Sequence, residues 1–182
     1  MKNLSIGFIA IAMLFGFSAP SVSAKMVDDP SDGFVKPENC EEQNARFDAQ
    51  MAKKAGVHAN LNSNQAVLLE RMDLEIGNGY EYGVDPDLLK RAEAARVQVI
   101  TNQTVLEAAY QRMLANWQTY AGQACYLEKQ DWVAGISYTN TLAQSFEAAG
   151  KTSGLYLEAV VRPIMEDLTE ANFAANQPTS TK

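Results

Sequence analysis

Two cysteines, Cys40 and Cys125, are the residues whose type and number most directly suggest chemistry. In an oxidising compartment, two cysteines in one chain are expected to form a structural disulfide. The alternative is a pair of free, reactive thiols, which a C-x-x-C motif would favour, and the sequence contains none. The sequence therefore predicts a Cys40–Cys125 bridge, provided that the chain is exported.

Other residues that could bind a metal or catalyse a reaction are few. His58 is the only histidine, which excludes a zinc or di-iron centre built from several histidines, and we expect it on the surface of a connector. The C-x-x-C-H haem motif, the phosphate-binding glycine loop and the G-x-S-x-G elbow are all absent. Four methionines on apolar helix faces are typical of core packing: Met51, Met72, Met113 and Met165. We therefore expect no cofactor, no metal site and no catalytic residue.

One short run resembles the start of an enzyme domain. Residues 82–89 read Tyr-Gly-Val-Asp-Pro-Asp-Leu-Leu and resemble the opening of the soluble lytic transglycosylase domain. In that family a Glu-Ser pair follows about two helical turns later and supplies the general acid for glycan cleavage. Here residues 94–97 read Ala-Ala-Arg-Val, and Glu93 lies out of place with no serine after it. A peptidoglycan-cleaving enzyme is therefore a less favoured alternative function.

The N-terminal segment has the three parts of a cleavable signal peptide. Lys2 is the only charge before an apolar run over residues 6–17, and residues 22–24 end it with Val-Ser-Ala. A run of about a dozen apolar residues is shorter than the roughly 20 that span a bilayer. We expect cleavage after Ala24 and a periplasmic or secreted protein, with a retained N-terminal anchor as the alternative. An oxidising destination also favours the disulfide.

The chain that would remain is acidic. Without Lys2 it has 14 basic and 22 acidic residues, a net charge of −8. Nucleic acids and anionic lipids both need a basic surface, so neither is an expected partner. No later apolar stretch approaches the length of a membrane span.

Helical periodicity runs through most of the remaining chain, and no alternating pattern is long enough to predict a sheet. Residues 25–38 read as an extended arm, 39–175 as a single domain and 176–182 as a flexible tail. Helices are predicted over about 39–55, 65–76, 86–126, 131–148 and 154–174. Gly56, the Gly-rich run 77–83 and Gly150 are the predicted breaks, and Pro163 is expected to kink the last helix.

Residues 86–126 carry the clearest helical signal. Asp85 suits the N-cap and Pro86 the first helical position. A heptad seam then runs along the segment: Val99, Gln103, Leu106, Tyr110, Met113, Trp117, Tyr120 and Ala124. We expect one continuous helix, and a bend near residues 100–102 is the alternative.

The two cysteines are equally distant from the Gly-rich run, since their midpoint falls between residues 82 and 83. A helical hairpin that turns there brings Cys40 and Cys125 together at its open end. The sequence therefore predicts an all-α fold: an elongated antiparallel helical bundle with a long, coiled-coil-like hairpin closed by one disulfide.

The function expected from these features is that of an exported, non-enzymatic protein that binds a protein partner in the cell envelope. It would serve as a component of a secretion or conjugation apparatus, an inhibitor or an adaptor. Tyr80 and Tyr82, on the Gly-rich turn, are the candidate partner-binding residues, unless both rings fold back as a hydrophobic plug. The alternative is a carrier of an apolar small ligand, with a cavity lined by Trp117, Trp132, Tyr110 or Tyr138.

Overall fold

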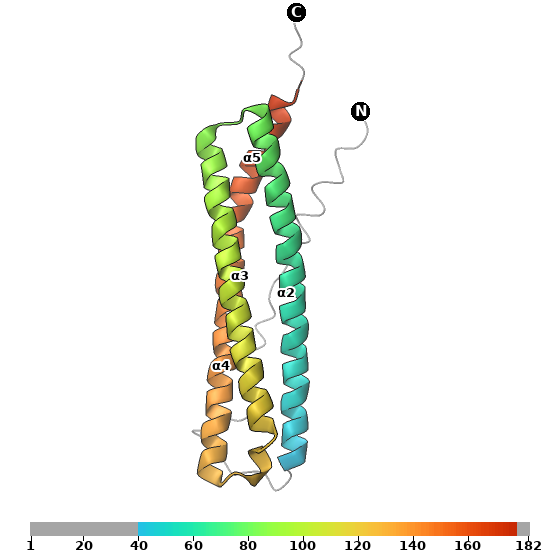
Figure 1. The fold of residues 1–182 in the computed structure, drawn as a ribbon, viewed down its shortest axis with the longest axis vertical. Helices are drawn as coiled ribbons and strands as arrows, with labels where there is room; N and C mark the ends of the chain where they lie inside the picture. Colours follow the sequence, from blue (N-terminus) through green and yellow to red (C-terminus); the bar gives the residue numbers. More distant parts are fainter. Residues whose placement is uncertain (1–39, 178–182) are drawn as a thin grey trace, which may run out of the picture.

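A computed structural model describes residues 40–177, and every element in that range is helical. In chain order the elements are α2 (Cys40–Tyr82), α3 (Pro86–Ala121), the 3₁₀ turn η2 (Ala124–Tyr126), α4 (Lys129–Tyr156), the π-helical turn η3 (Leu157–Val161) and α5 (Arg162–Ala175). Three long antiparallel rods pack side by side: α2, α3, and the column formed by α4, η3 and α5 (Figure 1). The predicted all-α helical bundle is confirmed. The predicted signal peptide, the arm and the last five residues lie outside the described residues.

The first rod, α2, is continuous from Cys40 to Tyr82, so the predicted break at Gly56 is wrong, and of the predicted break over residues 77–83 only Gly83 lies outside the helix. A glycine inside a helix costs only about 1 kcal/mol relative to alanine. Apolar residues at helical spacing continue on both sides of Gly56 and face the core: Phe47, Met51, Leu68, Met72 and Ile76. Burial of these side chains outweighs the cost of the glycines, because each buried apolar side chain stabilises the fold by about 1.5–3 kcal/mol.

The turn between α2 and α3 is therefore much shorter than the predicted Gly-rich break. Gly83 has a φ of +70°, a conformation that side chains with a Cβ rarely adopt. The N–H of Val84 then donates to the carbonyl of Gly79 at 2.9 Å and closes the end of α2. Gly79 also allows close packing, since a Cβ there would lie 2.5 Å from Cδ2 of Leu89 and 3.3 Å from Cδ1 of Leu168.

The second rod, α3, starts as predicted. Asp85 is the N-cap, where its Oδ1 accepts a hydrogen bond from the backbone N–H of Asp87 at 3.0 Å, and Pro86 is the first helical residue. The helix passes residues 100–102 without interruption, which confirms the predicted continuity. It ends at Ala121 and not near residue 126, because η2 follows as a separate 3₁₀ turn. Six of the eight predicted seam residues are buried, while Gln103 and Tyr110 are half-buried.

The third rod runs from α4 through η3 into α5, so the predicted break at Gly150 and the helix start near Gly154 are wrong. A Cβ at Gly150 would make ordinary contacts, 3.8 Å from Leu106 and Leu61. Shortly before Pro163, where a kink was predicted, lies the π-helical turn η3, in which the N–H of Arg162 donates to the carbonyl of Leu157. Proline has no N–H and its ring clashes with the carbonyl four residues earlier, so a wider turn relieves both problems.

The core falls into two apolar clusters along the length of the bundle. The cluster near the open end contains Phe47, Met113, Trp117 and Trp132. The cluster near the α2–α3 turn contains Met72, Leu89, Val99 and Leu168. Two buried polar residues, Gln65 and Ser153, join α2 to α4 through a hydrogen bond of 2.8 Å between Nε2 and Oγ. No helix within residues 40–177 is long and apolar enough to cross a membrane.

Candidate functional site

The end of the bundle at the α2–α3 turn, which we call the tip, carries both predicted partner-binding tyrosines. Tyr80 and Tyr82 lie in the last turn of α2. Tyr80 is 59% exposed, and its hydroxyl donates a hydrogen bond of 2.7 Å to Oε1 of Glu93 on α3. That hydrogen bond raises the pKa of the Tyr80 phenol, assisted by partial desolvation and by the carboxylate charge. Tyr82 is half-buried.

The surroundings of the tyrosines are acidic and include another exposed aromatic ring. Glu81, Asp85 and Asp87 are all exposed at the turn. The helix α5 ends at the same end of the bundle (Figure 1), and its Phe173 is exposed. Glu93, which the lytic transglycosylase resemblance singled out, is an exposed residue that accepts the Tyr80 hydrogen bond.

His58 lies inside α2, so its predicted position on a surface connector is wrong. Its ring stacks flat on Tyr110 of α3, with centroids 3.8 Å apart and an interplanar angle of 8°. Its Nε2 is 2.6 Å from Oε2 of Glu107, and Asn62 lies within hydrogen-bonding distance of both groups. The histidine therefore fixes the contact between α2 and α3. Among residues 40–177, no group of three or more His, Cys, Asp or Glu is placed to hold a metal ion.

The pKa of Glu107 is lowered, first by the hydrogen bond from Gln111 and then by those from His58 and Asn62. A carboxyl whose pKa is lower in the folded state stabilises the protein above its unfolded value of about 4.3, and this stabilisation disappears as the pH falls. We expect Glu107→Gln to make the melting temperature depend less steeply on pH below about pH 5, where the carboxyl begins to take up protons in the unfolded chain. If the melting temperature of the variant falls as steeply with decreasing pH as that of the wild type, this role of Glu107 is wrong.

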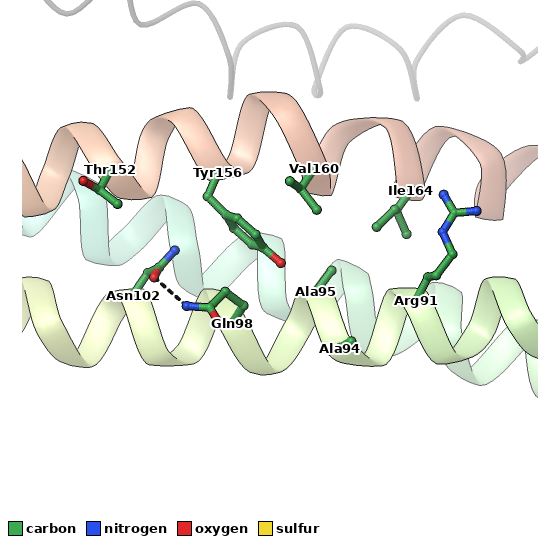
Figure 2. Close-up of a pocket in the computed structure, with 9 residues that line it drawn as sticks. All are labelled: Arg91, Ala94, Ala95, Gln98, Asn102, Thr152, Tyr156, Val160 and Ile164. Carbon is green, nitrogen blue, oxygen red and sulfur yellow. Dashed lines mark hydrogen bonds between the residues drawn. The ribbon is translucent and has the colours of Figure 1, made fainter.

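A groove of about 640 Å³ lies between α3 and the column of α4, η3 and α5 (Figure 2). Tyr156 reaches from α4 towards α3 and comes close to Gln98, whose Nε2 donates to Oδ1 of Asn102 at 2.9 Å. Burial raises the pKa of the Tyr156 phenol. Arg91 closes the other end of the groove, where its guanidinium is 3.7 Å from the carboxylate of Asp167. The groove thus has a polar and an apolar part, and the sequence did not predict it.

The open end of the bundle brings the start of α2 next to the segment after α3. Asn44 lies one helical turn after Cys40, and its Nδ2 donates to the carbonyl of Ala121 at 3.2 Å. The same amide nitrogen is 3.6 Å from Sγ of Cys125. The backbone segments that carry the two cysteines are therefore neighbours.

The four aromatic residues predicted to line a carrier cavity have different environments. Trp117 and Trp132 are buried in the core cluster at the open end, and Tyr110 packs against that cluster. The indole Nε1 of Trp117 donates to Oδ1 of Asp48 at 2.8 Å, whereas Tyr138 is exposed.

No family model, curated protein or solved structure matches this chain.

Proposed function

We propose that this chain is an exported, non-enzymatic protein that binds a protein partner in the cell envelope through the tip of the bundle. It would act in the periplasm or after secretion, as a component of a secretion or conjugation apparatus, an inhibitor or an adaptor. The observation that carries the proposal is Tyr80, a largely exposed ring held in place by its hydrogen bond to Glu93.

Two physical arguments support the tip as the binding surface. Aromatic side chains supply much of the binding energy of protein interfaces. A ring that is already oriented loses little conformational freedom on binding, so more of the contact energy appears as affinity. Tyr80 satisfies both conditions, because two packed helices carry the ring and its hydrogen-bond acceptor.

We expect Tyr80→Ala combined with Tyr82→Ala to reduce recovery of the partner at least tenfold in a cross-linked pull-down from an envelope fraction. Loss of one hot-spot ring costs about 2 kcal/mol or more, which exceeds the roughly 1.4 kcal/mol of a tenfold change in affinity. Helicity measured by circular dichroism should not change. Tyr126→Ala is the matched control, because Tyr126 is also an exposed tyrosine but lies in η2, at the open end of the bundle. Equal recovery with the tip variant and the control would overturn the proposal.

We also propose that Cys40 and Cys125 form a disulfide at the open end of the bundle. Support comes from the position of Cys40 at the first residue of α2 and from the contact between Asn44, one turn later, and Cys125. Thiol titration of the unfolded, unreduced protein should find no free thiol, and two free thiols would contradict the bridge.

A further inference from the structure

We infer that the chain pairs with a second copy of itself through one uncharged face formed by α3 and α4. Two of the 25 residues from 97 to 121 are charged, and so are two of the 25 from 132 to 156, whereas charged residues make up 20% of the whole chain. Two of these four point towards α2: Glu107 binds His58, and Glu147 forms an ion pair with Lys54. Depletion of charge is what distinguishes the centre of a protein interface from other surface.

The uncharged residues are arranged in two stripes. Exposed residues on α4 follow alternating steps of three and four: Tyr138, Thr141, Ser145, Ala148, Thr152 and Leu155. Exposed residues at the same spacing on α3 are Gln98, Thr101, Val105, Ala108, Arg112 and Ala115, with Arg112 as the only charge. Gln98 and Thr152 line the same groove, so helical spacing places both stripes on one side of the bundle. We call this side the uncharged face, because eleven of its twelve residues carry no charge.

Most hydroxyl groups on this face already have a hydrogen-bond partner within their own helix. Thr101 donates to the carbonyl of Val97, Thr141 to that of Ser137 and Ser145 to that of Thr141, each at 2.9–3.0 Å. Burying a polar group costs about 1–3 kcal/mol only when it is left without a partner. The face can therefore be covered by another protein surface at little desolvation cost. The face also carries large hydrophobic side chains: Val105, Tyr138 and Leu155 are between 54% and 61% exposed.

Charge and area favour a second copy as the occupant. The chain has a net charge of −7, so two copies repel each other wherever their acidic surfaces meet. The uncharged face lets two copies approach while the acidic surfaces point away. Twenty-five helical residues span about 37 Å, and two adjacent helices are roughly 20 Å wide. The face therefore covers about 750 Å², close to the roughly 800 Å² per partner of a stable interface.

The test is the molar mass in solution of the chain without residues 1–24, measured by light scattering during gel filtration up to about 100 µM, where even weak pairs are populated. We expect a dimer for the wild type. Tyr138→Glu combined with Leu155→Glu should weaken association at least about 100-fold, because like charges would meet across the interface. Val105→Lys combined with Ala148→Lys should do the same with the opposite charge, and serves as a second variant if the first does not fold.

The matched control is Val67→Glu combined with Leu74→Glu, on the outer side of α2. These residues are 54% and 62% exposed, as the substituted residues of the uncharged face are. The control and the tip variant Tyr80→Ala/Tyr82→Ala should both remain dimeric, so this inference and the proposed tip function can fail independently. A monomeric wild type, or dissociation caused by the α2 control and not by the substitutions on the uncharged face, would overturn the inference.

Discussion

Replacing Gly135 with alanine should lower the free energy of unfolding by about 2 kcal/mol, although alanine is the better helix former. Gly135 lies inside α4, where a Cβ would overlap the ring of Tyr120 on α3 and lie 2.6 Å from its Cδ2. That ring is 6% exposed and packs against Trp117, and its hydroxyl donates to the carbonyl of Trp132 at 3.1 Å. Because the ring is held on several sides, the two helices must separate to accommodate the methyl group.

The measurement is chemical unfolding followed by circular dichroism, with Gly77→Ala as the matched control. A Cβ at Gly77 meets no atom within 4 Å, so this substitution inside α2 should stabilise the protein by up to about 1 kcal/mol. In the Gly135→Ala background, Tyr120→Leu should cost less than it does alone, because the smaller side chain removes the overlap. If Gly135→Ala stabilises the protein as Gly77→Ala does, the close approach of α3 and α4 at this point is wrong.

The glycines within the helices show which features of the fold could be predicted from the sequence and which could not. Burial of apolar residues at helical spacing drives formation of these helices, so this periodicity identified helical segments in all three rods, although the predicted breaks divided the first and the third rod into two helices each. The cap at Asp85 follows from local chemistry and was found where predicted, and a π-helical turn lies shortly before Pro163, where a kink was predicted. A glycine, however, ends a helix only when no packing continues beyond it. That condition failed at Gly56 and Gly150, because buried residues follow each of them.

The candidate sites depend on how the rods are rotated against one another, which helical spacing within one segment does not specify. His58 and Glu107 are 49 residues apart, and their contact requires a particular register of α2 on α3. The groove beside Tyr156 likewise needs the pairing of α3 with α4. The scarcity of charge over residues 97–121 and 132–156 was visible in the sequence. That the two segments form one continuous face becomes apparent only when both are known to lie side by side.

Reducing the proposed Cys40–Cys125 bridge should destabilise the protein by about 4 kcal/mol, the largest effect that we expect from a change at two residues. The bridge would close a loop of about 85 residues, and a closed loop of that length limits the conformations of the unfolded chain. For a domain of this size, the loss corresponds to a fall in melting temperature of roughly 10 °C. The folded structure should change little, because large apolar side chains form the core cluster near the open end, among them Phe47, Trp117 and Trp132.

The experiment compares urea unfolding of the wild type with and without reductant, and of the variant Cys40→Ser/Cys125→Ser. Reductant should shift the unfolding midpoint of the wild type towards that of the variant and should leave the variant unchanged. The variant removes both sulfurs, so no unpaired thiol remains to cross-link two chains. The interaction of Asn44 with the carbonyl of Ala121 does not require a cysteine and should persist. A wild-type midpoint that does not respond to reductant under unfolding conditions would show that the open end is held by helix packing alone.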